Sequence, residues 1–117
     1  MNTLVTFNAQ RALVDFDNDS SSVAEVLLAF LEDVDASLSA LEDAPAGGRE
    51  LFVAVLHELA NSLDSIWCFD GGRRVREIEK QCRGDAPMET AAIQQEVNHL
   101  MQAAAEQART WLCDHFA

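Results

Sequence analysis

The sequence predicts an all-α fold: an antiparallel up-down-up-down four-helix bundle with a short N-terminal helix across one end, formed by a single domain of residues 1–117. Apolar residues recur every three or four positions through four long segments, as they do in amphipathic helices. The chain has only 5 Gly and 2 Pro, fewer turn residues than a sandwich or barrel of many short strands needs. Its 117 residues, 49% of them hydrophobic, are enough to build one core.

The first half of the chain predicts a short helix and then a long one. The short helix is expected at about residues 8–15, where Asn8 could cap its N-terminus. The long helix is expected to begin at Ser22, because Ser22-Val-Ala-Glu25 has the spacing of a capping box. It should end near Asp43, before the helix-breaking segment Ala-Pro-Ala-Gly-Gly at 44–48. Its apolar stripe consists of Val23, Leu27, Phe30, Val34, Leu38 and Leu41.

The second half predicts three further helices. One is expected at about 49–67, with the stripe Phe52, Val55, Leu56, Leu59, Leu63 and Ile66. Asp70-Gly-Gly is expected to be a turn, with Asp70 as the cap of a helix that ends near Arg83 and buries Val75, Ile78 and Cys82. The last helix is expected at about 87–115, with Pro87 in its first turn. Its stripe is Ile93, Val97, Leu100, Ala104, Ala108 and Trp111. Short linkers between long helices favour antiparallel neighbours.

Charge and cysteine content restrict the partners and the compartment. With 8 Lys and Arg against 20 Asp and Glu, the chain carries a formal net charge of −12. Nucleic acid and anionic membranes would repel such a chain, so neither is expected as a main partner. No apolar stretch reaches the ~18–20 residues of a membrane helix, and the N-terminus lacks the pattern of a secretory signal. Three cysteines without a CxxC pair indicate a reducing compartment, so we expect a cytoplasmic protein.

His57 is unusual because it lies on the polar side of its predicted helix. On a helical wheel the apolar stripe lies about 160–260° away from His57, so the ring should be exposed near mid-helix. The same face carries Glu50, Ala54, Asn61 and Asp64, which are small or polar. An exposed neutral imidazole can attack phosphorus and hold a phosphoryl group as a phosphoramidate. The simpler alternative is an ordinary surface histidine.

The residues after His57 follow a recognisable spacing. A Leu lies two positions on, a Ser five, an Ile nine, and an Ile-Glu pair twenty-one and twenty-two positions on. These residues are Leu59, Ser62, Ile66, Ile78 and Glu79. The pattern resembles the signature of histidine-containing phosphotransfer (Hpt) domains, roughly H-x-L-K-G-S followed by a distant L-E. Upstream, Phe7-Asn8, Asp19 and the segment 26–33 are similar to the first two helices of that family.

The resemblance implies a function as well as a fold. Hpt domains are monomeric four-helix bundles that relay phosphoryl groups between receiver-domain aspartates in bacterial two-component phosphorelays. By position, His57 would be the phosphoacceptor, in a phosphocarrier rather than a true catalyst, with no cofactor or metal of its own. The expected partner is a response-regulator receiver domain or a hybrid sensor kinase. The chain departs from the pattern at Ala60 and Asn61, where the family has Lys and Gly, so Ala60→Lys is expected to speed transfer.

A receiver domain is expected to dock over the face around His57. Ala54, Asn61 and Ser65 would keep this face small, while Asp64 adds negative charge.

A compensating cation can come from the next helix. If the two helices pair antiparallel about the turn at 67–70, residues whose numbers sum to about 137 lie level with each other. This register places Lys80 near His57 and Arg76 near Asn61. Alternatively, these basic residues only balance Glu77 and Glu79 within their own helix.

Two other functions remain open. Ala60 and Asn61 favour an Hpt-like adaptor or inhibitor that binds a receiver or a sensor kinase without transfer. The long last helix would also suit a small helical-bundle chaperone. No metal site is expected: Asn61 replaces the second His of an HExxH motif, and the ExxH element Glu96–His99 has no second copy.

Overall fold

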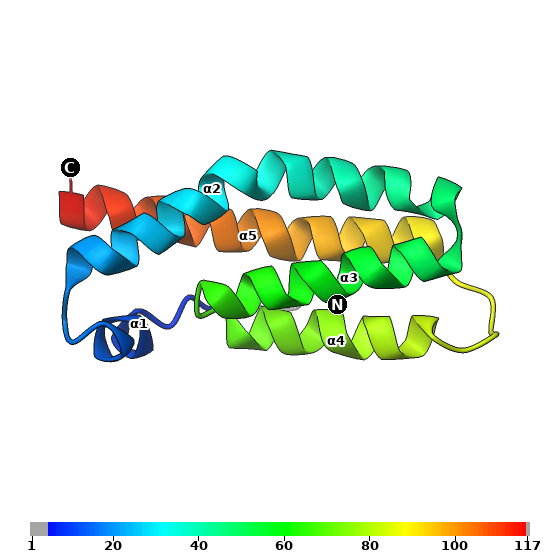
Figure 1. Cartoon of the computed structure of the whole chain (residues 1–117), viewed down its shortest axis with the longest axis horizontal. Coiled ribbons are helices and arrows are strands. Elements are labelled where there is room, and N and C mark those ends of the chain that lie inside the picture. Colours follow the sequence, from blue (N-terminus) through cyan, green and yellow to red (C-terminus); the bar gives the residue numbers. More distant parts are fainter. Residues whose placement is uncertain (1–4, 117) are drawn as a thin grey trace.

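The computed structural model describes residues 5–116, and this part of the chain is all-helical (Figure 1). No β-strand occurs between residues 5 and 116, which confirms the predicted all-α class. The predicted domain also includes residues 1–4 and 117, which lie outside the described residues. Within the described range, no helix is both long enough and apolar enough to cross a bilayer.

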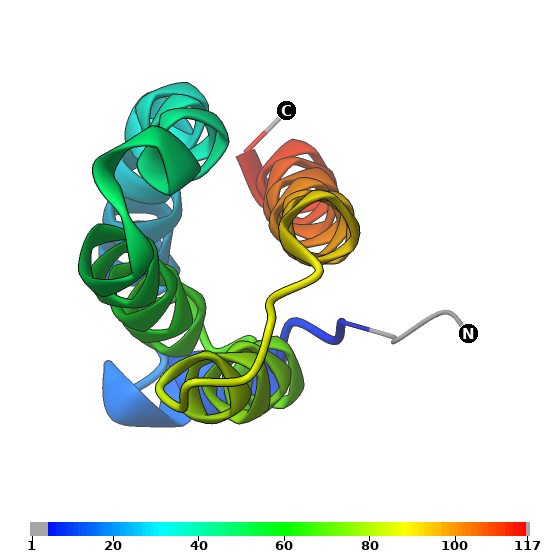
Figure 2. The same cartoon turned by 90° about the vertical axis from the view of Figure 1, so that its right-hand side faces the viewer.

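Five α-helices and one 3₁₀ turn make up the described part of the chain. They are α1 (Ala9–Asp15), α2 (Ser20–Asp43), η1 (Ala44–Gly47), α3 (Arg49–Ser65), α4 (Phe69–Cys82) and α5 (Thr90–Phe116). The four long helices, α2 to α5, lie roughly along the long axis, and each runs opposite to the one before it (Figure 1). Viewed along that axis, α3 lies between α2 and α4, and α5 lies beside α2 (Figure 2).

The predicted apolar stripes form the core. Of the residues expected to be buried, only Leu38, Val55 and Ile93 are half-buried rather than buried. The largest fully buried side chains include Leu27, Leu41, Phe52, Leu56, Leu63, Ile78, Leu100 and Met101. Burying one such side chain contributes about 1.5–3 kcal/mol, so these stripes supply the main driving force for folding.

The predicted N-cap is confirmed for α1, whereas α2 has a different one. Asn8 caps α1, because its Oδ1 accepts a hydrogen bond from the Arg11 N–H at 3.0 Å. The capping box predicted at residues 22–25 is wrong, since α2 begins at Ser20. Its N-cap is Asp19, which accepts from the Ser21 N–H at 3.0 Å. The earlier carboxylate occupies the cap, so the helix gains two more residues at its N-terminus.

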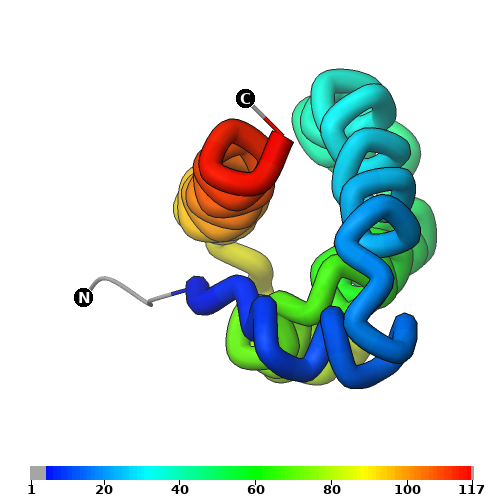
Figure 3. Tube along the Cα trace, turned by 90° about the vertical axis from the view of Figure 1, so that its left-hand side faces the viewer, coloured from blue at the N-terminus to red at the C-terminus, as the bar shows by residue number. Residues whose placement is uncertain are grey.

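The predicted starts of α4 and α5 are also wrong. Asp70 is not a cap but lies in the first turn of α4, where its Oδ1 accepts hydrogen bonds from the Gly71 N–H and from the Thr6 N–H at 3.0 Å. This contact ties the segment that precedes α1 to the α3–α4 turn, so that it runs between α4 and α5 (Figure 3). Pro87 lies in the linker before α5, which begins at Thr90.

A tight turn and a close helix contact position α3 against α4. Trp67 lies in the turn after α3, in the left-handed region with φ of 59°, and its indole N–H donates to Asp15 at 2.9 Å. Further along, Gly72 lies against α3, where an added Cβ would be 3.2 Å from the carbonyl oxygen of Ala60. Glycine therefore lets the two backbones approach closely, which brings the polar side chains of α3 within reach of α4.

Candidate functional site

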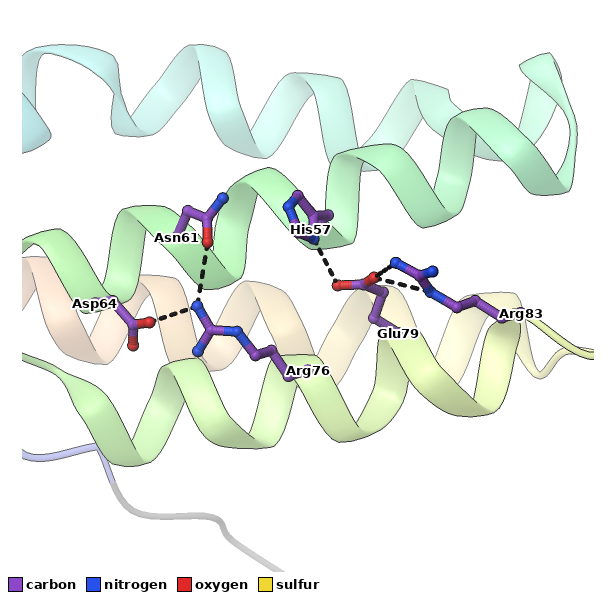
Figure 4. Close-up of polar contacts among 6 residues, drawn as sticks. All are labelled: His57, Asn61, Asp64, Arg76, Glu79 and Arg83. Carbon is purple, nitrogen blue, oxygen red and sulfur yellow. Dashed lines mark hydrogen bonds and ion pairs between the residues drawn. The ribbon is translucent and has the colours of Figure 1, made fainter.

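His57 lies near the middle of α3, with 54% of its side chain exposed. The ring faces away from the core, as the helical wheel predicts, but it is not free in solvent. Its Nδ1 atom lies 3.2 Å from Oε1 of Glu79, which extends from α4 (Figure 4). The Glu79 side chain is only 6% exposed. The exposed imidazole is therefore in contact with a nearly buried carboxylate.

This contact decides which ring nitrogen carries the proton. A carboxylate oxygen can only accept a hydrogen bond, so Nδ1 of the neutral ring is protonated and donates to Glu79. The other nitrogen, Nε2, keeps its lone pair. An unprotonated nitrogen on an exposed ring is the form of histidine that can act as a nucleophile.

Glu79 is held in the charged form by two donors. Its burial by itself would raise the pKa of the carboxyl, but hydrogen bonds from Arg83 and then from His57 outweigh that effect and lower the pKa below its usual value of 4.5. Arg83 is the C-cap of α4, four residues after Glu79, and its Nε donates to Oε2 of Glu79 at 3.0 Å. Glu79 is therefore ionised at neutral pH and fixed in position on both of its oxygens.

An open hollow lies between α3 and α4 beside the imidazole. It is lined by His57, Arg76, Glu79, Lys80 and Arg83. Three of the eight basic residues of the chain thus line one small depression. The ammonium group of Lys80 makes no ion pair or hydrogen bond with another residue in the range 5–116.

Arg76 links the hollow to the polar face of α3. Its Nη2 donates to Oδ1 of Asn61 at 3.1 Å and to Asp64 (Figure 4). The charge of Asp64 is therefore paired rather than free to repel an anion at His57. The predicted register places Arg76 near Asn61 and Lys80 near His57. In the structure Arg76 contacts Asn61, and Lys80 and His57 line the same hollow.

The alternative, that the basic residues only balance glutamates of their own helix, holds for some of them and not for others. Arg74 pairs with Glu77 of the same helix, and Arg83, the C-cap of α4, pairs with Glu79. Arg76 instead reaches across to α3.

Position 60 does not lie open beside the imidazole, which removes the reason for expecting Ala60→Lys to speed transfer. Ala60 is fully buried, with 0% exposure, because α4 packs against this part of α3 at Gly72. A lysine at position 60 would begin inside the core instead of beside the imidazole. The other predicted residues of the face, Ala54, Asn61 and Ser65, are exposed, whereas Asp64 is half-buried.

The sequence reasoning missed Arg83 as a member of the site. The available signal was its spacing of four residues from Glu79, which places the two side chains on the same face of α4.

The remaining candidate motifs form no second site. Within residues 5–116 no group of three or more His, Cys, Asp and Glu side chains could hold a metal ion. Glu96 pairs with Arg74, and His99 is exposed. Cys68 is buried, and that burial, followed by the charge of Asp70, raises its pKa to about 12. Its thiol is therefore unreactive at neutral pH.

Comparison with known proteins identifies no relative. No family model, no curated protein and no solved structure matches this chain. What the protein does therefore has to follow from the geometry around His57.

Proposed function

We propose that this protein is a histidine phosphotransfer protein whose four long helices form an up-down-up-down bundle of the Hpt type. In this proposal His57 receives a phosphoryl group from the aspartate of one receiver domain and passes it to another. The observation that carries the proposal is the contact between His57 Nδ1 and the nearly buried carboxylate of Glu79. It leaves Nε2 as an unprotonated nucleophile on an exposed ring near the middle of α3.

The chemistry requires little more of this chain. Nε2 attacks the phosphorus of an aspartyl phosphate and forms a P–N bond. The P–O bond to the aspartate breaks, and its electron pair leaves with the carboxylate. The ring becomes positively charged while Nδ1 keeps its proton, and the adjacent Glu79 carboxylate stabilises that charge. The reverse step returns the group to a second receiver, so the protein acts as a phosphocarrier.

The face around His57 supports docking of a receiver domain. Ala54, Asn61 and Ser65 are exposed and short, so a partner can approach the ring closely. Pairing of Asp64 with Arg76 removes one source of repulsion toward an acidic receiver active site. In this proposal the partner is a receiver domain or a hybrid sensor kinase. The protein acts as a monomer in the cytoplasm of a bacterium.

Transfer of radiolabelled phosphate tests the proposal. Purified receiver domains are phosphorylated with ³²P and mixed with the full chain, and we expect label on this protein that is stable in base and labile in acid. His57→Gln should abolish labelling, whereas the control His99→Gln, which changes an exposed histidine of α5, should not. Base-labile label, or label that persists in His57→Gln, would contradict the proposal.

One observation favours a second candidate, a receiver-binding adaptor that does not transfer. Arg76 holds the Asn61 side chain on the surface one turn from His57. The Hpt pattern has glycine at this position, so Asn61 adds bulk to the docking face. A receiver that binds the protein tightly without labelling it would support the adaptor function.

A further inference from the structure

We propose that the hollow beside His57 is a site for a phosphoryl dianion, with Lys80 as its main cation and Arg76 as the second. This inference rests on the proposed function, because the anion it would hold is the phosphoryl group on Nε2 of His57. In the Hpt pattern a lysine at the position of Ala60, on α3, would supply the cation, whereas here the cation comes from α4. The cation is displaced from one helix of the pair to the other.

The distribution of charge in the hollow favours an anion. Three basic side chains line it, against the single carboxylate of Glu79. Arg83 is paired with Glu79, and Arg76 is paired with Asp64, so the ammonium of Lys80 is the uncompensated charge. Elsewhere the chain, at a net charge of −12, repels a phosphate dianion.

The helical geometry puts the two cations on the same edge of the hollow. Arg76 and Lys80 are four residues apart on α4, so they lie on one face about one turn from each other. Arg76 uses only Nη2 for its contacts with α3, which leaves Nε and Nη1 without a hydrogen bond in the described chain. Together with the three donors of the ammonium group, these N–H groups can reach several phosphoryl oxygens.

Helix α3 cannot supply this cation itself. Position 60, where the Hpt pattern has lysine, is fully buried against α4. The close approach of α4 that buries Ala60 also brings Lys80 to the hollow. The same helix contact therefore leaves no room for a cation at position 60 and supplies one from α4.

Titration with inorganic phosphate tests the site without a receiver. The full chain is titrated with phosphate at constant ionic strength, and the His57 ring and the Lys80 side chain are followed by NMR. We expect saturable shifts of both groups, and binding about five-fold weaker in Lys80→Gln, as for a partly exposed charge pair. Lys80→Arg should keep most of the affinity. Arg73→Gln is the matched control, because it removes an exposed charge of α4 that does not line the hollow.

Labelling of His57 by a small phosphodonor distinguishes failure of the anion site from failure of the proposed function. With phosphoramidate, Nε2 of His57 forms a P–N bond as the P–N bond of the donor breaks, and ammonia leaves with the electron pair. If Lys80→Gln weakens phosphate binding and slows this labelling while Arg73→Gln does neither, the inference is supported. If Lys80→Gln binds phosphate as tightly as the native protein and is labelled on His57 as fast, the anion site is overturned. The assignment of His57 as the phosphoacceptor is then unaffected.

The other outcomes are equally informative. Phosphate binding that depends on Lys80, in a protein whose His57 is never labelled, supports the anion site and contradicts the phosphoacceptor. Equal losses in Lys80→Gln and Arg73→Gln would show a general effect of net charge and overturn the inference.

Discussion

Replacing Glu79 by glutamine changes the charge under the imidazole while it leaves the side chain nearly the same size. The carboxylate accepts from His57 Nδ1 at 3.2 Å and from Arg83 Nε at 3.0 Å. Hydrogen bonds to charged groups contribute about 1.5–3 kcal/mol, against about 0.5–1.5 kcal/mol for neutral ones. The difference, about 1–1.5 kcal/mol, is roughly ten-fold in an equilibrium or a rate. We therefore expect Glu79→Gln to slow phosphoryl transfer to His57 about ten-fold.

Two measurements check this expectation. Long-range ¹H–¹⁵N correlation of the ring should show His57 protonated on Nδ1 in the native protein and a weakened preference in Glu79→Gln. Transfer from a phosphorylated receiver then gives the rate. Glu77→Gln is the control, because it removes an exposed carboxylate of the same helix. A native ring protonated on Nε2, or a folded Glu79→Gln protein that accepts phosphate at the native rate, would refute the mechanism.

The same substitution predicts a pH dependence of stability. The pKa of Glu79 is lower in the folded protein than its usual value of 4.5. Its contribution to stability is therefore present above about pH 4.5 and is lost as the pH falls through the lower, folded value. The free energies of unfolding of native protein and Glu79→Gln, measured by urea titration, should differ at pH 7 and converge in acid. A difference that grows in acid would contradict the assigned ion pair.

The remaining predictions concern packing. Gly72→Ala should destabilise the protein by about 1–3 kcal/mol, because its methyl group would meet a carboxylate and a carbonyl of α3, whereas Gly84→Ala, in open space, should change the melting temperature little. Ala60→Lys should lower the melting temperature and not speed transfer, since position 60 is buried; a stable variant with faster transfer would contradict that assignment. Iodoacetamide at pH 8 should modify exposed Cys113 quickly and buried Cys68 only after denaturation, as mass spectrometry of the native and unfolded protein would show.

Much of the site's position followed from local pattern. A helical wheel depends only on the backbone of one helix, so the orientation of His57 away from the stripe of α3 could be predicted. The position of Arg76 beside Asn61 could be predicted from antiparallel pairing of α3 and α4 about a short turn. Both predictions depend on regular helix geometry, which is set by residues close together in the sequence.

The contact partner of His57 could not be predicted in the same way. Register arithmetic pointed to Lys80, yet it is Glu79 that reaches Nδ1. Adjacent residues on a helix point about 100° apart, so the rotation of α4 about its own axis decides which of the two side chains faces the imidazole.

The sequence by itself determined the helical class, the apolar stripes and the polar face that carries His57, because hydrophobic periodicity is a local property. Only the tertiary structure decided how α4 is rotated against α3. Close packing at Gly72 and the sharp turn at Trp67 set that rotation, and through it they bury Ala60 and place a carboxylate beneath the imidazole. These contacts join residues far apart in sequence, and their energies depend on how two surfaces fit together, which no single helix encodes.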